Sequence, residues 1–487
     1  MYLGLDIGTS AVKAVLLGAD GKLVGQAESP LAVSRPQPSW SEQDPEDWWL
    51  ASIDAVRQLP AKSRAAVQAV GLSGQMHGAT VLDMQGRVLR AAILWNDGRA
   101  FAQCAELEAR EPHSREITGN IAMPGFTAPK LLWLREHEPE VFRRIAHVLL
   151  PKDYVRLRLT GEYLSDFSDS SGTLWLDVGA RAWSQRMLSA CDLDIAQLPG
   201  LVEGSDPAGQ LTASAAQQLG VPVVTVAGGG GDNAAGAVGA GVVAGGQALL
   251  SLGTSGVIFV ANDRFMPNPA GAVHAFCHAL PGRWHQMAVL LSAASCLDWV
   301  ARLGGFPGVP AALAAAQRRS RATPLPLFLP YLSGERTPHN DPYARGVFFG
   351  LDHDTDAAAL VQSVLEGVAL ALRDGLRVLS DAGTSISELS VIGGGSRSLD
   401  WAQLLASALE CTLVIRDAAD VGPALGAARL AALAVRGSSI EELCIPPPVV
   451  RIVEPDASEV NRLRERSERF RSLYRALRDQ FPREVTH

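Results

Sequence analysis

The chain has 487 residues, of which 47% are hydrophobic and 19% are charged, and its formal net charge is −8. This length is too great for a single hydrophobic core, so we expect two or three domains, with the composition of a globular enzyme. The acidic balance provides no positive field for nucleic acid or an anionic membrane, and neither is an expected partner.

Targeting and redox signals are also informative. The N-terminus has no basic stretch, Asp6 interrupts its short apolar run, and no membrane-length run lacks charges or glycine turns. The six cysteines are scattered, and none belongs to a CxxC or another metal-ligand spacing. We therefore expect a cytoplasmic protein with free thiols and with neither a signal peptide nor a transmembrane helix.

The beginning of the chain is predicted to form antiparallel strands. Residues 2–7 and 11–17 are apolar, the tripeptide Gly8-Thr9-Ser10 turns the chain between them, and a third strand begins at Leu23. Helices and buried strands then alternate, which is typical of an α/β protein. Strands are predicted at residues 67–72, 91–95 and 223–227, and helices from the Asp44 N-cap and at 99–110 and 128–137.

A second beginning is visible in the middle of the chain. Residues 247–252 and 256–260 are predicted strands, and the tripeptide between them is again Gly-Thr-Ser, at Gly253-Thr254-Ser255. Strands at 389–392 and 412–415 and helices at 357–379 and 401–409 follow. We therefore expect two similar α/β halves, forming domains at residues 1–243 and 244–487.

The C-terminal stretch, residues 460–481, is basic and has the periodicity of a helix. It places Leu463, Phe470, Leu473, Tyr474 and Leu477 on one face. Acidic residues are interleaved with the basic ones, so we expect it to dock on its own domain. A helix that binds a membrane or a partner is the alternative.

The two Gly-Thr-Ser turns are candidate phosphate-binding sites. Gly8 lets backbone N–H groups approach a phosphate, Thr9 and Ser10 add hydroxyl donors, and Lys13 follows three residues later. Asp6, at the end of the preceding strand, can hold a magnesium ion directly or through water. The second turn, at Gly253, Thr254 and Ser255, would complete a clamp on one polyphosphate. Plain β-turns are the alternative.

The glycine run before Asp232 is the most informative segment. A strand leads into four glycines at 228–231, and a helix of small residues follows Asp232 and Asn233. Glycines remove side chains where a ligand must approach, so the carboxylate is expected to face a crevice. There it could accept a proton from a hydroxyl that attacks a γ-phosphate. A simple N-cap is the alternative role for Asp232.

Two strand ends offer groups for a sugar. Met76 and His77 follow the strand at 67–72, where His77 would bond hydroxyls and Met76 would pack on carbon atoms. Trp95 and Asp97 follow the next strand, at the same sheet edge, where ligands of α/β sheets bind. The alternatives are a packed turn with a satisfied histidine, and an N-cap role for Asp97.

A second glycine loop suits a nucleotide. Residues 393–395, which include Gly394 and Gly395, follow a strand and precede a helix, so an adenine or a ribose could lie on the backbone. A glycine-rich loop without a ligand is the alternative. Residues 239–244 match GxGxxA and suggest a dinucleotide site, but the preceding residues are predicted to be helical, and that fingerprint needs a strand there.

Together these segments resemble the carbohydrate kinase family named for its FGGY motif, within the actin-like ATPase superfamily. The first family signature is similar to residues 125–134, GFTAPKLLWL, and the second to residues 346–351, GVFFGL, continuing to 363–367, SVLEG. The second departs from the pattern at Ala359, where the family usually has a polar residue. The resemblance covers nearly the whole chain and implies two ribonuclease-H-like domains that flank a deep catalytic cleft, with ATP and Mg²⁺ as cofactors.

Within the family, residues 40–49, 75–78, 95–99 and 231–234 are most similar to members that act on D-xylulose. This implies ATP-dependent phosphorylation of D-xylulose to D-xylulose 5-phosphate, with Asp232 as general base. Another sugar or polyol, such as ribulose, gluconate or glycerol, is one alternative. An actin-like or chaperone-like ATPase is an alternative of another class. Related kinases commonly form dimers, so a homodimer is also expected.

The resemblance also implies roles for individual residues. Met76, His77 and Asn233 would hold the sugar, and Asp6 and Asp232 would lie at the magnesium ion. Thr9, Gly253 and Thr254 would face phosphates. Gly394 and Ser398 would lie by the nucleotide, and Trp299 would flank the adenine.

Overall fold

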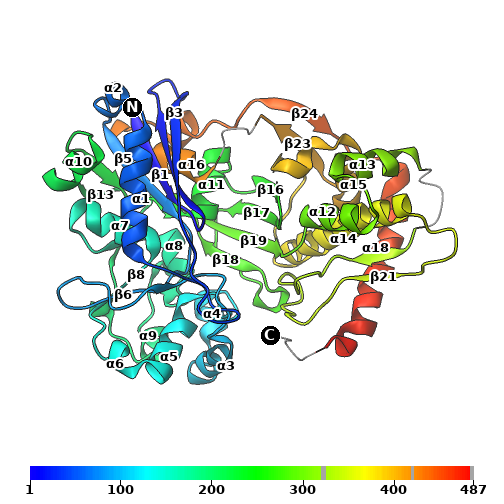
Figure 1. Ribbon diagram of the computed structural model, residues 1–487, viewed down its shortest axis with the longest axis horizontal. Coiled ribbons are helices and arrows are strands. Elements are labelled where there is room, and N and C mark those ends of the chain that lie inside the picture. The colour runs from blue at the N-terminus through cyan, green and yellow to red at the C-terminus, as the bar shows by residue number, and fades with distance from the viewer. Residues whose placement is uncertain (320–324, 418–421, 483–487) are drawn as a thin grey trace.

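Two mixed β-sheets, one from each half of the chain, form the framework of the computed structural model, which describes residues 1–319, 325–417 and 422–482 (Figure 1). The first sheet has the order β13-β14-β5-β1-β2-β3, with β15 paired to β5. Its strands are β1 (Tyr2–Ile7), β2 (Ala11–Leu17), β3 (Leu23–Pro30), β5 (Ala69–Gly74), β13 (Pro207–Gln210), β14 (Thr225–Ala227) and β15 (Gly230–Gly231).

The second sheet repeats the central pattern of the first. Its order is β18-β19-β17-β16-β22-β23-β24. Its strands are β16 (Ala248–Leu252), β17 (Gly256–Asn262), β18 (His274–Cys277), β19 (Trp284–Leu290), β22 (Glu388–Ile392), β23 (Thr412–Arg416) and β24 (Val449–Val453). β16 runs antiparallel to β17 and parallel to β22, just as β1 runs antiparallel to β2 and parallel to β5. Two such sheets confirm the predicted α/β class with two ribonuclease-H-like units.

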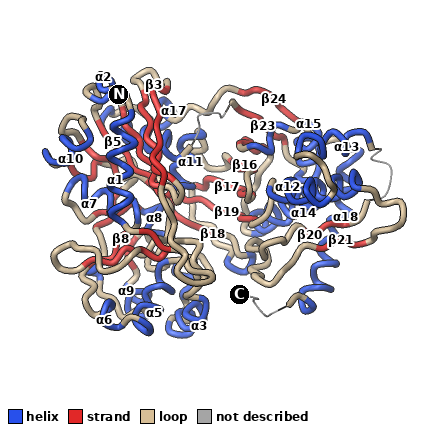
Figure 2. Tube along the Cα trace, in the orientation of Figure 1, coloured by secondary structure: helices blue, strands red, loops and turns tan. Residues whose placement is uncertain are grey.

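Helices cover both sheets, and short strand pairs join the loops (Figure 2). In the first half the helices are α1 (Pro45–Gln58), α2 (Ala61–Arg64), α3 (Phe101–Arg110), α4 (Ser114–Thr118), α5 (Thr127–His137), α6 (Pro139–Phe142), α7 (Pro151–Thr160), α8 (Phe167–Ser171), α9 (Gln185–Ala190), α10 (Ala213–Leu219) and α11 (Asp232–Ala240). In the second half they are α12 (Ser295–Leu303), α13 (Val309–Arg318), α14 (Ala357–Asp381), α15 (Leu399–Leu409), α16 (Pro423–Arg436), α17 (Ile440–Leu443) and α18 (Ala457–Leu477). The short strands are β4 (Glu42–Gln43), β6 (Thr80–Leu82), β7 (Ala92–Ile93), β8 (His147–Leu149), β9 (Leu164–Asp166), β10 (Leu176–Asp177), β11 (Ala182–Trp183), β12 (Gly200–Val202), β20 (Leu327–Leu329) and β21 (Val347–Phe349), and the 3₁₀ turns are η1 (Ile195–Gln197), η2 (Pro269–Gly271), η3 (Gly394–Arg397) and η4 (Arg478–Gln480).

The local signals in the sequence explain several of these elements. Asp44 caps α1 by accepting a 3.0 Å hydrogen bond from the backbone N–H of Glu46, as predicted. The strand predicted at 91–95 is shorter, because only Ala92–Ile93 pairs with β4. α3 begins at Phe101 with Ala100 as its N-cap, so the alternative of an N-cap role for Asp97 is wrong.

The C-terminal helix α18 docks on its own half. Leu463, Phe470, Leu473 and Tyr474 are buried in the core of that half, which confirms the predicted apolar face. Arg462 and Arg466 of this helix form ion pairs with the buried Glu366 of α14. In the described part of the chain, no helix combines the length and the apolar character that crossing a membrane requires.

One helix of the second half leaves its own sheet. α16 lies against β1 and β5 of the first sheet and beside α11, and Figure 1 shows it in orange among the blue strands. The contact is made backbone to backbone: a Cβ atom at Gly71 would stand 1.9 Å from the carbonyl oxygen of Ala427, and one at Gly4 would stand 2.0 Å from that of Ala424. The glycines therefore let the helix sit directly on the strands. The sequence prediction of separate domains at 1–243 and 244–487 did not include this crossing.

Candidate active site

A cavity of about 250 Å³ collects predicted site residues from both halves of the chain. The first half contributes Met76, His77, Trp95, Asp232 and Asn233, all of them predicted to bind a sugar. The second half contributes Ser255 of the second Gly-Thr-Ser turn. It also contributes residues that the sequence did not single out for this site, among them His274, Phe276 and Arg336.

Asp232 is the first residue of α11 and stands in this cavity. Its Oδ1 atom accepts hydrogen bonds from the backbone N–H (2.7 Å) and the side-chain Nδ2 (2.8 Å) of Asn233. Gly231, not Asp232, occupies the N-cap position, so the alternative of a simple capping role is wrong. Burial raises the pKa of Asp232 to about 6, against the opposing effect of the bonds from Asn233. A carboxyl group with this pKa can accept a proton near neutral pH.

The glycines before Asp232 are required by their surroundings. Gly229 has a φ of +76°, and a Cβ atom there would stand 2.2 Å from the carbonyl oxygen of Leu72. A Cβ atom at Gly231 would meet Met76, with its Sδ atom at 3.0 Å. The glycine run thus brings the chain close to β5 and leaves room for Met76 beside the carboxylate.

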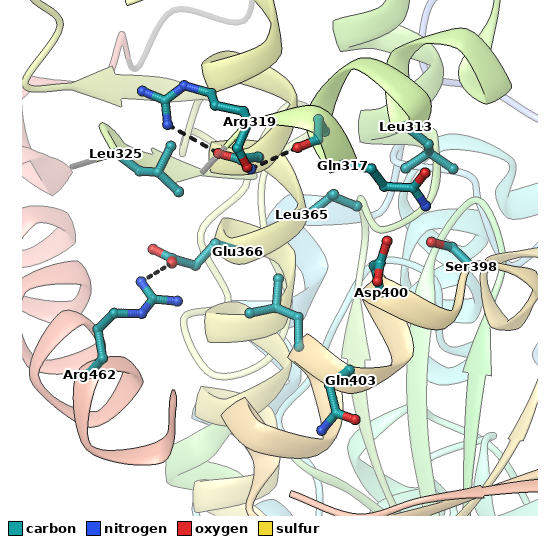
Figure 3. A pocket seen from close by; sticks show the side chains of 13 residues that line it. Leu313, Gln317, Arg319, Leu325, Leu365, Glu366, Ser398, Asp400, Gln403 and Arg462 are labelled. Atoms are coloured by element: carbon teal, nitrogen blue, oxygen red, sulfur yellow. Dashed lines mark hydrogen bonds and ion pairs between the residues drawn. The ribbon is translucent and has the colours of Figure 1, made fainter. Parts of the chain in front are cut away.

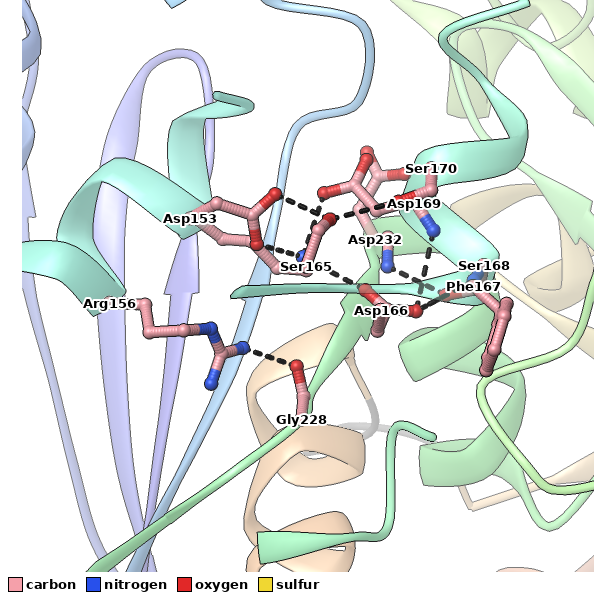
Figure 4. Close-up of polar contacts among 12 residues, drawn as sticks. Asp153, Arg156, Ser165, Asp166, Phe167, Ser168, Asp169, Ser170, Gly228 and Asp232 are labelled. Carbon is pink, nitrogen blue, oxygen red and sulfur yellow. Dashed lines mark hydrogen bonds and ion pairs between the residues drawn. The ribbon is translucent and has the colours of Figure 1, made fainter. Parts of the chain in front are cut away.

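A buried cluster of charged side chains lies next to this segment (Figure 4). Lys152 of α7 forms ion pairs with Asp153 (2.5 Å), Asp166 (2.8 Å) and Asp169 (3.2 Å), and none of the four side chains is exposed. Burial disfavours a charged lysine, but the three carboxylates outweigh it and raise the pKa of Lys152. The pKa of Asp169 is raised by burial as well.

Two residues connect the charge cluster to the glycine run. Ser168 donates a hydrogen bond to Asp166, and its Oγ atom accepts one from the backbone N–H of Gly231 (3.1 Å). Arg156, which is also fully buried, donates to the carbonyl oxygens of Ala227 (2.8 Å) and Gly228. The backbone before Asp232 is therefore held from both its N–H and its C=O side.

Asp6 lies at the end of β1, close enough to Asp232 for the two carboxyl groups to interact. Burial and the charge of Asp232 raise the pKa of Asp6 to about 7, against the effects of Ser73 and Lys13. Its Oδ1 atom is buried and has no hydrogen-bond partner among the described residues. Two neighbouring carboxyl groups, one with an unused oxygen, form a donor set that suits Mg²⁺, which binds one or two carboxylates together with substrate phosphates.

The first Gly-Thr-Ser turn is fastened to the neighbouring elements. The hydroxyl of Thr9 donates to Oε1 of Gln75 (3.0 Å) and accepts from the indole N–H of Trp95 (3.0 Å). Gln43 donates to the carbonyl oxygen of Thr9 at 2.7 Å. Lys13 lies in β2, directly across from Asp6 in the strand register, with an exposed side chain. Gly8 and Ser10 complete the turn, with Ser10 exposed.

The second turn is fastened to the start of α12. The carbonyl oxygen of Gly253 accepts a hydrogen bond from the backbone N–H of Ala294 (2.9 Å), and that of Thr254 accepts from Ala293 N–H (2.9 Å) and Ser295 Oγ (2.8 Å). Ser255 reaches the cavity of Asp232. This second turn and the β1 end with Asp6 thus both approach Asp232.

His77 is held in one orientation. Its Nδ1 atom lies 2.7 Å from the carbonyl oxygen of Gly172, and burial lowers the pKa of His77 to about 3. The neutral ring must carry its proton on Nδ1, because a carbonyl oxygen only accepts, so Nε2 is left as an acceptor. His77 has a φ of +70°, an uncommon backbone conformation for a residue other than glycine. The lone pair on Nε2 suits a sugar hydroxyl.

Two predicted site residues have other contacts. Asp97 borders a wider cleft that continues from the cavity, but its oxygens accept from Arg99 (2.9 and 2.7 Å) and from the backbone N–H of Ser41 (2.6 Å). Trp299 stacks on Phe328 and Phe348 in the core of the second half, at ring distances of 5.6 and 6.0 Å. The structure therefore gives both side chains packing or pairing partners within the protein, and their contact with a ligand stays a prediction.

A separate cavity of about 400 Å³ lies in the second half (Figure 3). Ser398, predicted to lie by the nucleotide, lines it together with Leu313 and Gln317 of α13 and Leu365 of α14. The neighbouring loop carries Gly394 and Gly395. A Cβ atom at Gly394 would meet nothing within 4 Å, so a flat ring could approach the backbone there.

The dinucleotide alternative is wrong. Residues 232–240 form the helix α11, so no strand precedes the GxGxxA match at 239–244. Gly239 instead serves helix packing, since a Cβ atom there would stand 2.7 Å from the carbonyl oxygen of Gly422, at the start of α16.

The sequence alone did not indicate the charge cluster or the position of Arg336 in the cavity. Lys152 and Asp153 resemble an ordinary helix start after Pro151, and the signal that could have revealed them is the polar run at 165–171 inside an otherwise apolar half. Arg336 lies in a loop with no periodic pattern, so nothing local distinguishes it from a surface arginine.

Sequence comparison gives matches along the chain. Residues 1–239 match the N-terminal domain and residues 248–435 the C-terminal domain of the FGGY family of carbohydrate kinases. A xylulose kinase from Escherichia coli (strain K12) is 55% identical over 479 residues, which are 98% of this chain and 99% of that protein. A xylulose kinase from Bacillus subtilis (strain 168) is 37% identical over 88% of this chain and 87% of its own.

Solved structures agree with these matches. The crystal structure of a xyloylose kinase from Brucella ovis superposes with a TM-score of 0.95 at 51% identity, covering 98% of this chain and 99% of that one. Plasmodium falciparum glycerol kinase with ADP shares the fold, with a TM-score of 0.88 at 20% identity and 98% of each chain covered.

Proposed function

The chain belongs to the FGGY family of carbohydrate kinases, and on that premise we propose that it is a xylulose kinase in which Asp232 is the general base. It transfers the γ-phosphoryl group of ATP to the O5 hydroxyl of D-xylulose, giving ADP and D-xylulose 5-phosphate. The xylulose kinases that match over nearly their full length support the substrate. The position of Asp232 in the cavity supports its role as the general base.

The observation that carries the mechanism is the setting of Asp232. Its hydrogen bonds from Asn233 both use Oδ1, so the lone pairs of Oδ2 remain for a ligand. The cavity around it also holds Met76, His77 and Asn233. Asp232 orients the O5 hydroxyl and accepts its proton as the oxygen attacks phosphorus, and His77 Nε2 accepts from another hydroxyl of the sugar.

The phosphates lie between the two Gly-Thr-Ser turns. Hydrogen-bond donors from both turns surround the charge that develops on the transferred group. They come from Gly8, Thr9, Ser10 and Lys13 on one side and from the turn at 253–255 on the other. Asp6 and Asp232 would hold Mg²⁺, which neutralises charge on the phosphoryl oxygens when it is bound. The unused buried oxygen of Asp6 supports this assignment.

The nucleoside end of ATP occupies the cavity beside Ser398. Gly394 and Gly395 offer backbone to the ribose, and the apolar side chains of α13 and α14 offer a surface for adenine. The division into domains at 1–243 and 244–487, a homodimeric assembly and a cytoplasmic location complete the proposal. The C-terminal end of the second domain, residues 483–487, lies outside the described residues.

A coupled assay of ADP release tests this proposal. The purified full-length protein is supplied with ATP, Mg²⁺ and one of D-xylulose, D-ribulose, gluconate, glycerol or no sugar. We expect the highest kcat/KM with D-xylulose and negligible ADP release without sugar. A higher kcat/KM with another member of the panel would identify that compound as the substrate and leave the family assignment unchanged. Rapid ADP release without sugar, accompanied by filament formation, would favour an ATPase of the actin-like class.

A further inference from the structure

Arg336 is a cation in the wall of the sugar cavity that the transfer described above does not use. It comes from the second half, in the loop that follows β20, and lines the cavity together with Met76, His77 and Asp232. Its Nη1 atom lies 3.5 Å from Nε2 of His274, which is a long contact. Among the described residues it forms no ion pair with a carboxylate within 4.0 Å.

The carboxyl group of the preceding residue, Glu335, does not form an ion pair with Arg336. Glu335 is 2% exposed, and burial raises its pKa to about 8, against the effects of two backbone N–H groups and of the Arg336 charge. Its Oε1 atom accepts from the backbone N–H groups of Leu291 (2.9 Å) and Arg336 (2.8 Å), while Oε2 has no partner among the described residues. An arginine stays charged in proteins. A guanidinium in such a place is costly unless a ligand satisfies its donors.

The neighbours of Arg336 place it at the His77 end of the cavity. Its charge contributes to lowering the pKa of both His274 and His77, which burial lowers most. The ring of Phe126 connects the two histidines, with centroid distances of 4.8 Å to His77 and 5.5 Å to His274. Sugar atoms bound between Asp232 and this end have acceptors in Asp232 and His77, and a donor in Arg336.

The chemistry of the substrate gives that donor a target. The furanose ring of a 2-ketopentose closes through its O5 atom, so a molecule whose O5 is free for phosphorylation is the open-chain form. That form has a carbonyl at C2. A carbonyl oxygen only accepts hydrogen bonds, whereas every sugar hydroxyl both donates and accepts. Arginine has five N–H donors and no acceptor.

We propose that Arg336 donates a hydrogen bond to the C2 carbonyl oxygen of the open-chain ketose and thereby selects a ketose over sugars and polyols that lack this group. This inference rests on the proposed function, because the carbonyl exists only if the substrate is a ketose. Asp232 of the first half would then hold the sugar at O5, and Arg336 of the second half would hold it at O2.

The experiment pairs two variants with two substrates. The substrates are D-xylulose and the 2-deoxy pentitol of the same C3 and C4 configuration, in which a CH₂ group replaces the carbonyl. The variants are Arg336→Ala and the more conservative Arg336→Lys. The exposed Arg264 of the same half is changed to Ala as a matched control. Michaelis constants for sugar and for ATP are measured, with the pentitol used as substrate or as competitive inhibitor, and thermal unfolding confirms that each variant is folded.

We expect Arg336→Ala to raise the KM for D-xylulose about 10- to 100-fold, the range for loss of a hydrogen bond to a charged donor. Binding of the 2-deoxy pentitol should change less than about threefold, because it has no carbonyl to lose, and the KM for ATP should stay within about twofold. Arg336→Lys should give an intermediate loss with D-xylulose, and this variant carries the test if Arg336→Ala does not fold. The Arg264→Ala control should match the wild type.

Three results would overturn the assignment. Equal losses with the ketose and the 2-deoxy pentitol would mean that Arg336 only supports the cavity. A raised KM for ATP as the main effect would place its guanidinium on the phosphates. Unchanged constants would mean that it touches neither ligand. Failure of the proposed function is distinguishable, because the wild type would then not phosphorylate D-xylulose at all.

Discussion

The Oγ atom of Ser168 accepts a 3.1 Å hydrogen bond from the backbone N–H of Gly231, the residue directly before Asp232. The same hydroxyl donates to Asp166, which is ion-paired with the fully buried Lys152. One hydroxyl thus links a buried charge cluster to the backbone that carries the proposed base, and a buried polar network of this kind rigidifies the segments that it joins. Asp232 therefore owes its place to residues that never reach the substrate.

Ser168→Ala should lower kcat about tenfold with little change in either KM, because the backbone at Gly231 loses an acceptor and the base is less well placed. Ser170→Ala is a matched control in the same short helix: Ser170 is equally buried, but its hydroxyl bonds to Ser165 (3.0 Å) and not to the glycine run. Steady-state kinetics of the two variants check the prediction. Equal effects would show that the cluster stabilises the fold without positioning Asp232.

Asp232→Asn should lower kcat by a factor of about 10²–10⁴, the range for loss of general base catalysis, because an amide cannot accept the proton. The KM for ATP should change little, since the proposed nucleotide cavity lies elsewhere. Asp263→Asn, which changes an exposed acid directly after β17, serves as the control. Turnover of the Asp232 variant within a few fold of the wild type in the ADP-release assay would rule out this residue as the base.

The rate should also depend on pH in a defined direction. A general base acts in its ionised form, and burial raises the pKa of Asp232 to about 6. kcat/KM, which reports the free enzyme, should therefore be nearly constant above about pH 7 and fall as pH drops through 6, approaching a tenfold loss per pH unit. The residual activity of Asp232→Asn should lack this limb. A wild-type kcat/KM that stays flat down to pH 5 would contradict the assignment.

Gly71→Ala should destabilise the protein by about 3 kcal/mol, the upper end of the usual range for overpacking, because the added Cβ atom would stand 1.9 Å from the backbone oxygen of Ala427 in α16. Backbone cannot swing aside as a side chain can. Gly25→Ala on β3 is the control, since its Cβ atom would meet nothing closer than 3.6 Å, at Leu59. Denaturant unfolding compares the two, and equal stabilities would mean that α16 can shift away from the sheet at little cost.

Glu410 should make a contribution to stability that depends on pH. Hydrogen bonds from Arg464 and Arg373 lower the pKa of Glu410 to about 2. Its folded-state pKa lies below the unfolded value, so the contribution is present above about pH 4.5 and is lost as pH falls toward 2. Glu410→Gln should lower Tm at pH 7 by about 1–2 °C, given solvent screening, and the difference from wild type should narrow between pH 5 and 3. A difference that does not vary with pH would contradict an electrostatic origin.

Much of the fold could be predicted from local patterns. The strands at 2–7 and 11–17, the repeated Gly-Thr-Ser turn and the second sheet follow from apolar runs and turn residues, which act over a few positions. The glycine run also revealed Asp232, because four glycines serve no purpose in an ordinary helix start. These are the parts of the molecule in which local preference and tertiary structure agree.

The remaining features depend on how side chains from different elements meet in the folded chain. Asp97 had a plausible role as a ligand or a cap, and only the fold shows that Arg99 and Ser41 occupy its oxygens. The Lys152 cluster forms from three carboxylates that come from separate elements. The position of Arg336 beside His274 joins residues 62 positions apart, and no periodicity records such a meeting.

The crossing of α16 has a consequence for how the chain is made. The ribosome completes the first half about 180 residues before it reaches Pro423, which at about 5–20 residues per second leaves the glycine-lined face of β1 and β5 uncovered for roughly 10–40 s. During that time the nascent first half carries an exposed apolar surface, and it can finish folding only when nearly the whole polypeptide has emerged. The two halves are thus joined in their biogenesis, and a fragment that ends at residue 243 would lack the segment that seals its own core.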